Sequence, residues 1–208
     1  MNPHIFRAYD IRGVADRDLD DDFVRQLGQA IGTFVRRAGV SSLALGRDCR
    51  THSPRLHRAL LSGLLMSGLE IFDVGIVPSP LLYFAVHHLR TGAGVEITGS
   101  HNPASDNGFK IVLGDTPLHG EGLKLLRSLV ESRDFITGEG TVQAVSIVDD
   151  YRRFVKERLS LGPRRFPIAL DAGNGTGGAI AVELFESLGF PVTPLHCEMD
   201  GRFPFHPP

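Results

Sequence analysis

Apolar residues recur along this chain with two periods, one typical of helices and the other of strands. Residues 23, 27, 31 and 34 are apolar at helical spacing, between aspartates at 20–22 and Gly39, so we expect a helix there. Ser53 followed by Pro54 predicts the cap and first turn of another. In all, the pattern predicts helices at 23–38, 53–68, 79–90 and 121–130 and strands at 43–45, 71–74, 94–97 and 109–113. This alternation predicts an α/β fold, a sheet with helices on its faces.

The pattern starts again after a flexible stretch at 137–140. We expect a strand at 142–148, an amphipathic segment at 151–159 and a break at 162–163. Strands at 166–170 and 192–195 then bracket a helix at 178–188, and 201–208 follows as a loop. One βαβ unit is too small to be a finished domain. We therefore expect a boundary near 146–150, with a first domain at 1–147 and an incomplete second domain at 148–208.

Composition and charge narrow the class of protein. The chain has 208 residues, 42% hydrophobic and 22% charged, so it can bury a core and is not a disordered chain. A net charge of -2 gives no reason to expect nucleic acid or an anionic membrane as a partner. Cys49 and Cys197 lack metal-site spacing and indicate reduced thiols. The charged N-terminus and the interrupted apolar stretch 60–72 argue against a secretory signal and a membrane span, so we expect a cytoplasmic protein. The sequence does not indicate its oligomeric state.

The segment 98–103 (TGSHNP), with 107–110 (NGFK), brings Ser100, His101 and Lys110 within one loop. It follows the predicted strand 94–97, Gly99 frees the backbone before the serine, and Pro103 restricts it afterwards. A serine held in this way at the end of a strand is a candidate for covalent phosphoryl chemistry. The same residue types also build ordinary polar turns, which is the alternative interpretation.

A second motif permits a different function. Gly173, Gly175 and Gly178 fit G-x-G-x-x-G between a predicted strand and helix, and Glu198 follows twenty residues later, where a ribose-binding acid would lie. The same glycines also suit any tight strand-to-helix turn. Dinucleotide binding therefore stays open as an alternative at this point.

Four segments together resemble the motifs of the α-D-phosphohexomutases, the bacterial phosphomannomutase/phosphoglucomutase enzymes. They are 6–13 (FRAYDIRG), 46–50 (GRDCR), 98–110 and 171–177 (DAGNGTG), in the family's order and spacing. The resemblance runs through the whole chain. It implies a mixed sheet with helices on both faces, followed by the first βαβ unit of a second, similar domain. It also implies an intramolecular phosphotransferase that interconverts the 1- and 6-phosphates of mannose or glucose through an active-site phosphoserine and a bisphosphate intermediate.

The resemblance assigns roles to individual residues. Ser100 matches the residue that carries the phosphate. Arg12 matches an arginine that contacts the transferring phosphate, and Lys110 matches a lysine that serves as proton donor or acceptor and charge partner. His101, beside the serine, can hydrogen-bond a phosphate oxygen or a sugar hydroxyl and can relay a proton near neutral pH.

Supporting roles go to four further residues. We expect Tyr9 to line the site and Asn102 to hold the loop by side-chain hydrogen bonds, both at the substrate-binding surface. Arg47 and Asp48 are expected to form an architectural pair beneath the site rather than to act as catalysts.

Two positions depart from the family's pattern. Asp106 stands where tyrosine is common, which adds a carboxylate near an anionic site, and Cys49 stands where a small or hydroxylated residue is usual.

The resemblance also implies Mg²⁺, hexose phosphates as ligands and glucose 1,6-bisphosphate as activator. In the family the phosphoserine, here Ser100, and aspartates of a third domain hold the metal, and a fourth domain grips the other phosphate. Those segments are not in this sequence, and Ser100 alone cannot complete a magnesium site. We therefore expect little or no turnover from this chain alone. The alternative from another class is a non-catalytic sugar-phosphate-binding remnant or assembly module.

Overall fold

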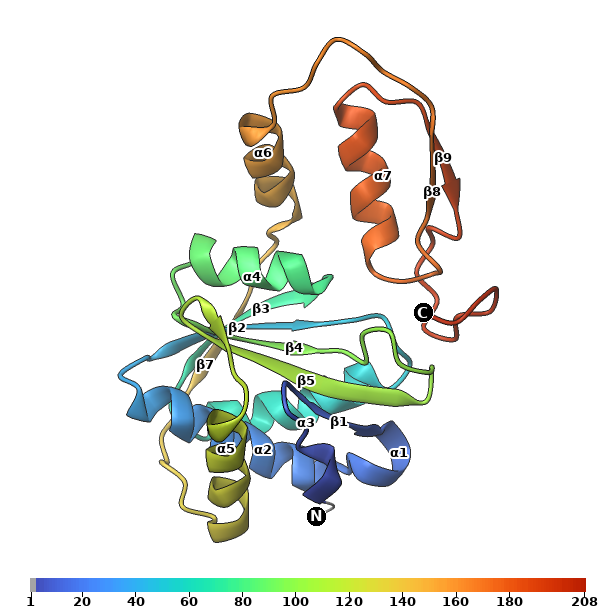
Figure 1. Ribbon diagram of the computed structural model, residues 1–208. Coiled ribbons are helices and arrows are strands. Elements are labelled where there is room, and N and C mark those ends of the chain that lie inside the picture. The colour runs from blue at the N-terminus through green and yellow to red at the C-terminus, as the bar shows by residue number, and fades with distance from the viewer. Residues whose placement is uncertain (1–2) are drawn as a thin grey trace.

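The computed structural model describes residues 3–208 and shows a main sheet between two layers of helices (Figure 1). Helices α2 (Asp21–Arg37), α3 (Ser53–Leu65) and α5 (Glu121–Ser132) cover one face of this sheet, and α4 (Ser79–His88) covers the other. A larger apolar core lies on the face of α2, α3 and α5, and a smaller one lies against α4. The predicted α/β fold with helices on both faces is confirmed.

The main sheet is mixed, with strand order β1-β5-β4-β2-β3-β7 and β6 paired to β5. Strands β4, β2, β3 and β7 are parallel neighbours, whereas β5 runs antiparallel to both β4 and β1. Because β1 pairs with β5, Arg12 lies opposite Gly108 and the N-terminal motif adjoins the serine loop. The strands are β1 Ile11–Val14, β2 Ser42–Arg47, β3 Glu70–Ile76, β4 Ala93–Ile97, β5 Asp106–Leu113, β6 Thr116–Pro117 and β7 Thr141–Ala144, and the short helices are η1 Pro3–Ile5 and α1 Ala15–Asp18.

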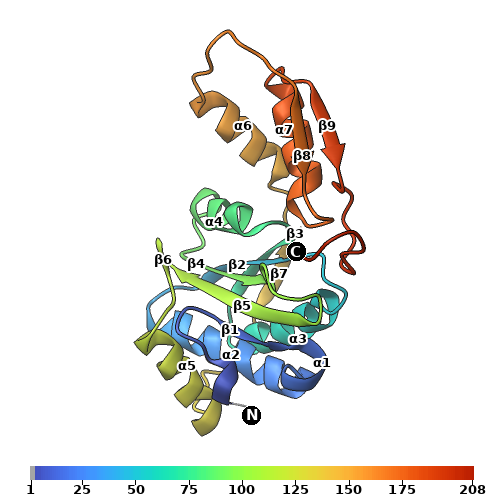
Figure 2. The ribbon, with the colours of Figure 1, turned by 45° about the vertical axis from the view of Figure 1, so that its right-hand side comes forward.

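A smaller unit follows on the α4 side of the main sheet (Figure 2). It contains α6 (Val148–Arg158), then β8 (Ile168–Asp171), α7 (Gly177–Ser187) and β9 (Val192–Leu195). Strands β8 and β9 are parallel, so the predicted βαβ unit is confirmed. The strand predicted at 142–148 is too long, because β7 ends at Ala144 and α6 begins at Val148. The domain boundary at 147/148 falls at the start of α6 and stays a prediction.

Helix α2 begins as its aspartates predict, whereas α3 does not. The Asp20 carboxylate caps α2 by accepting a 2.9 Å hydrogen bond from the Phe23 backbone N–H. In α3, Ser53 is the first helical residue and not the cap, because its hydroxyl donates to the Asp48 carboxylate at 2.5 Å. The start of α3 is therefore tied to the segment that follows β2.

Helices α2 and α3 pack backbone to backbone beneath the sheet. A Cβ added to Gly63 would lie 2.0 Å from the Arg25 carbonyl oxygen, and one on Gly28 would lie 2.4 Å from the Leu60 carbonyl oxygen. This close approach lets apolar side chains of both helices fill the larger core, among them Leu27, Ile31, Leu56, Leu60 and Leu64. It also fixes α3, and with it the segment at the carboxyl end of β2.

None of the helices formed by residues 3–208 is long and apolar enough to cross a membrane.

This helix crossing generates a stability prediction. We expect Gly63→Ala to lower the free energy of unfolding by about 1–3 kcal/mol, because the added methyl group meets rigid backbone. Gly177→Ala is the control: that glycine is also helical, but a Cβ there meets nothing within 4 Å. Urea denaturation followed by circular dichroism measures both variants. A Gly63→Ala protein as stable as Gly177→Ala would contradict the packing described here.

Candidate active site

The serine loop lies where two parallel strands end side by side. Strands β2 and β4 pair with Arg47 opposite Ile97, so the segments 48–50 and 98–103 leave the sheet at the same edge. Ligand sites in such sheets form at this edge. Ser100 has a φ of +54°, a left-handed conformation that is uncommon for a residue with a side chain. Its backbone N–H donates to Thr98 Oγ1 at 2.9 Å, which stabilises the turn.

Arg50 holds the loop from inside. Its side chain is only 1% exposed, and its guanidinium donates to four backbone carbonyls of the loop. These are the carbonyls of Ser100 (3.0 Å), Asn102 (2.7 Å), Pro103 (2.5 Å) and Asp106 (3.0 Å). Our sequence interpretation gave Arg50 no role, although it stands in the segment 46–50. Its place in this motif was the only sequence feature that could have indicated a role. The carbonyls it binds belong to residues about fifty positions later in the chain.

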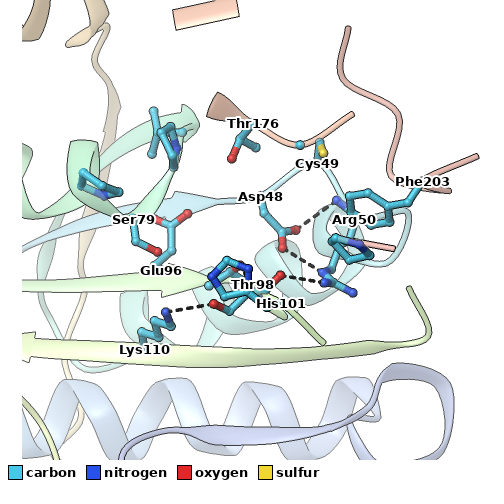
Figure 3. A pocket seen from close by; sticks show the side chains of 16 residues that line it. Asp48, Cys49, Arg50, Ser79, Glu96, Thr98, His101, Lys110, Thr176 and Phe203 are labelled. Atoms are coloured by element: carbon cyan, nitrogen blue, oxygen red, sulfur yellow. Dashed lines mark hydrogen bonds and ion pairs between the residues drawn. The ribbon is translucent and has the colours of Figure 1, made fainter. Parts of the chain in front are cut away.

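Asp48 also supports the serine loop. Its ion-pair partner is Arg50, which corrects the predicted pair of Arg47 and Asp48. Its carboxylate accepts from the Gly99 backbone N–H at 3.1 Å, from Ser53 Oγ, and from both the backbone N–H and Nε of Arg50. Asp48 thus supports the loop, and it pairs with Arg50 and not, as predicted, with Arg47. Figure 3 shows the Arg50 side chain turned toward the Asp48 carboxylate, which accepts from Arg50 Nε at 3.2 Å.

Ser100, His101 and Lys110 line one cleft of about 310 Å³ (Figure 3). Lys110 Nζ lies 3.4 Å from Ser100 Oγ, and the lysine comes from β5, beside the strand that precedes the loop. The opposite wall belongs to the smaller unit and includes Thr176 and Phe203. The structure therefore brings together three of the four predicted catalytic side chains, with a cation beside the hydroxyl oxygen.

Glu96 is a further acidic residue of this cleft, and the sequence interpretation gave it no role. It lies directly opposite Lys110 in the β4–β5 pair, is wholly buried, and neither carboxyl oxygen has a hydrogen-bond partner. Burial raises the pKa of Glu96 well above its usual value, and the nearby Asp48 charge adds to this, while Lys110 opposes it. A raised pKa favours the neutral acid, which places no negative charge directly opposite the Lys110 ammonium. An acidic residue inside an otherwise apolar strand was the signal available in the sequence.

Arg12, the fourth predicted catalytic residue, does not line this cleft but reaches the loop through Asn102. Its Nη1 donates to Asn102 Oδ1 at 2.5 Å, and its Nη2 forms a close ion pair with Asp10. Asn102 Nδ2 in turn donates to Asp106 Oδ2 at 3.1 Å. The Asn102 side chain thus joins Arg12 to the Asp106 carboxylate, and its place at the substrate-binding surface stays a prediction.

Tyr9 lies outside the cleft, whereas Cys49 is part of its lining. The Tyr9 side chain is 78% exposed, its ring lies 6.3 Å from that of His119, and it does not line the cleft. The Cys49 thiol is half-buried with Sγ 3.5 Å from the Asn174 carbonyl oxygen. Burial raises the pKa of Cys49 to about 11, so this thiol is neutral near pH 7.

The residues of this cleft do not by themselves fit a magnesium ion. Within residues 3–208, no group of three or more His, Cys, Asp or Glu side chains is placed to hold a metal. The Asp48 oxygens already accept hydrogen bonds, and burial raises the pKa of Glu96, which disfavours the carboxylate form that a metal would need. An octahedral oxygen site therefore needs ligands beyond those that surround Ser100 here.

The glycine-rich turn at 173–178 is explained by packing. Gly173 has a φ of +51°, and a Cβ on Gly178 would lie 2.4 Å from the Cys197 carbonyl oxygen. Asn174 Nδ2 donates to the backbone carbonyl of Glu198, the residue considered for ribose binding. Gly175 lines the same cleft as Ser100. The turn thus contributes to the serine site, and its glycines need no nucleotide to account for them.

Comparison with known proteins agrees with this geometry. Residues 3–136 match the family model of phosphoglucomutase/phosphomannomutase, alpha/beta/alpha domain I. The chain is 42% identical over 204 residues to a phosphomannomutase/phosphoglucomutase of Pseudomonas aeruginosa and 43% identical over 206 residues to a phosphoglucomutase of Neisseria gonorrhoeae. In both cases 98% of this chain is covered, but only 44% and 45% of the relative.

A solved structure shows the same fold. The crystal structure of a phosphoglucomutase/phosphomannomutase family protein from Burkholderia thailandensis superimposes with a TM-score of 0.95 at 36% identity, covering all of this chain and 47% of that one. This chain thus spans less than half of the length of the relatives it matches. From its motifs, its sheet and these matches, the chain belongs to the phosphoglucomutase/phosphomannomutase family and corresponds to the N-terminal portion of its longer members.

Proposed function

We propose that this chain carries the phosphoserine of a phosphohexomutase, with Ser100 as the residue that takes and returns the phosphoryl group. One observation carries the proposal: Ser100 Oγ faces Lys110 Nζ at 3.4 Å in a cleft, at the turn of a loop fixed by buried Arg50. Such an arrangement holds a hydroxyl beside a fixed cation, which is what the transfer of an anionic group requires.

The chemistry consists of two transfers through one oxygen. In the first, Ser100 Oγ attacks a phosphorus of a hexose bisphosphate, the bond from that phosphorus to the sugar oxygen breaks, and the serine proton ends on the sugar oxygen. In the second, a hydroxyl of a hexose monophosphate attacks the phosphoserine and its proton returns to Ser100 Oγ. Repeating this with the sugar turned round converts a 1-phosphate into a 6-phosphate.

Each neighbouring side chain has a proposed part in these steps. The Lys110 ammonium stabilises charge on the transferring group, and the raised pKa of Glu96 favours a neutral acid opposite it. His101, exposed at the cleft, hydrogen-bonds the phosphate or the sugar. Arg12 orients the loop through Asn102 and contributes positive charge near it.

The ligands we propose are mannose and glucose phosphates, with glucose 1,6-bisphosphate as phosphoryl donor, because the relatives are named for these sugars. We assign the serine loop to a first domain at 1–147 and the βαβ unit to the start of a second at 148–208. Since the cleft residues do not complete a magnesium site, we propose that Ser100 is phosphorylated in this chain but that repeated mutase turnover needs further oxygen ligands.

The first prediction concerns Ser100 itself. After incubation with glucose 1,6-bisphosphate and Mg²⁺, we expect one phosphate on the tryptic peptide that contains Ser100, measured by mass spectrometry. Ser100→Ala should lower this labelling by about 10³-fold or more, because no other nucleophile is held there. Equal labelling of folded Ser100→Ala protein, or a phosphate at another residue, would refute the assignment. Hexose-phosphate binding without any phosphate on Ser100 would favour a non-catalytic remnant.

The second prediction follows from the raised pKa of Glu96. The native carboxyl stays protonated while the unfolded chain ionises near pH 4.5, so rising pH favours the unfolded state. This loss of stability begins near pH 4.5 and continues up to the raised native pKa. Glu96→Gln removes it, so the stability of the variant relative to wild type should rise by about 1.4 kcal/mol per pH unit in that window.

Urea denaturation of both proteins at pH 5, 6 and 7 measures this difference. Glu121→Gln, an exposed position on α5, is the matched control for the loss of a surface carboxylate. If Glu96→Gln instead runs parallel to wild type across this range, Glu96 is ionised in the native state.

A further inference from the structure

The segment after β9 returns to the serine site and packs directly on the Arg50 backbone. Gly201 forms an isolated parallel bridge with Arg50. A Cβ added to Gly201 would lie 2.2 Å from the Cys49 carbonyl oxygen and 2.7 Å from Arg50 Cα. Only glycine permits this approach without a shift of backbone. The smaller unit is therefore joined at backbone level to the residue that holds the serine loop.

Two residues later, Phe203 meets the guanidinium. Phe203 has a φ of +51°, a left-handed conformation that strains a residue with a side chain, and its backbone N–H donates to the Asp200 carbonyl at 2.9 Å. In this conformation Arg50 Cζ lies 5.1 Å from the centroid of the Phe203 ring, a cation–π distance. The turn thus presents an aromatic face to a buried cation.

The hydrogen bonds of Arg50 explain why the Phe203 ring can contact the guanidinium only on its flat face. Nε donates to Asp48, and both terminal nitrogens donate to loop carbonyls, so the edge of the planar group is fully used. The guanidinium also lies against Gly99, where a Cβ would come within 2.5 Å of its Cζ and Nε. Arg50 is therefore in contact with Phe203, with the Gly99 backbone and with four loop carbonyls at once.

We propose that Phe203 is a positioning residue for Ser100. Its ring fixes the Arg50 guanidinium, and through it the serine loop, so that the smaller unit holds Ser100 Oγ in the orientation that the reaction needs. This rests on the proposed function for Ser100. Removing the ring opens a face of the guanidinium to water, which competes for the carbonyl oxygens that hold the loop. The loop then leaves the conformation in which Ser100 Oγ faces Lys110 Nζ.

Hydrogen–deuterium exchange of residues 98–106 tests the coupling without any substrate. The amides of Gly99, Ser100, Asn102 and Asp106 are all hydrogen-bonded within the site, so their exchange reports the order of the loop. Phe203→Leu should speed exchange in this segment about ten-fold, whereas Phe203→Tyr, which keeps the ring, should not. The matched control is Phe205→Leu, because the Phe205 ring stacks on His196 instead of Arg50.

The rate of Ser100 phosphorylation by glucose 1,6-bisphosphate is the second readout. Phe203→Leu should lower the maximal rate about ten-fold, with little change in the bisphosphate concentration that gives half of that rate. Phe203→Tyr, which keeps the ring, should react at the wild-type rate. Exchange that rises only within 200–208 in Phe203→Leu, or rises equally in Phe203→Tyr, would overturn the proposal. If wild type itself is not phosphorylated, the proposed function fails, while the exchange result still decides the coupling.

Discussion

The site depends on one buried cation and its need for hydrogen-bond acceptors. A guanidinium withdrawn from water must find a partner for each N–H, because a charged group left unpaired in the interior is costly. Arg50 meets this requirement with one carboxylate and four backbone carbonyls. Burial lowers the pKa of Arg50, and Asp48 offsets part of that effect. The loop therefore has little freedom: its carbonyls must converge on the guanidinium, and Ser100 takes a left-handed conformation as a result.

The charged groups around Ser100 are arranged so that a positive charge faces its hydroxyl. Asp48 is occupied by Arg50 and by backbone donors, so its charge serves the loop. Glu96 lies opposite Lys110, but its burial raises its pKa and so favours the neutral acid beside that lysine. One positive group, Lys110, is left facing Ser100 Oγ across 3.4 Å. The cleft is thus suited to an anionic group that approaches the serine, in agreement with the phosphoryl transfer that we propose.

Much of the fold could be predicted from the sequence because its elements have local signals. The acidic helix start at 20–22, the helical spacing from Phe23 to Phe34 and the apolar strands can all be recognised within a few residues of sequence. Ser100, His101 and Lys110 could be selected because they lie within eleven residues of sequence, although Lys110 belongs to β5 and not to the loop. The roles of Arg50 and Glu96 could not be predicted, because both arise from tertiary packing. The carbonyls that Arg50 binds lie about fifty residues away in the sequence, and Glu96 lacks hydrogen-bond partners only because the folded chain buries it. Ser53 shows the same limit: its local setting favours a helix cap, but the buried Asp48 carboxylate claims its hydroxyl.

The most direct test of this account is the rate at which glucose 1,6-bisphosphate phosphorylates Ser100 in an Arg50→Lys variant whose circular dichroism matches wild type. Lysine keeps the positive charge but has three donors in place of five, so it cannot hold Asp48 and all four carbonyls. The account predicts a rate about 100-fold below wild type, because a loop displaced by an ångström misaligns the nucleophile. A folded Arg50→Lys protein that is phosphorylated at the wild-type rate would contradict it.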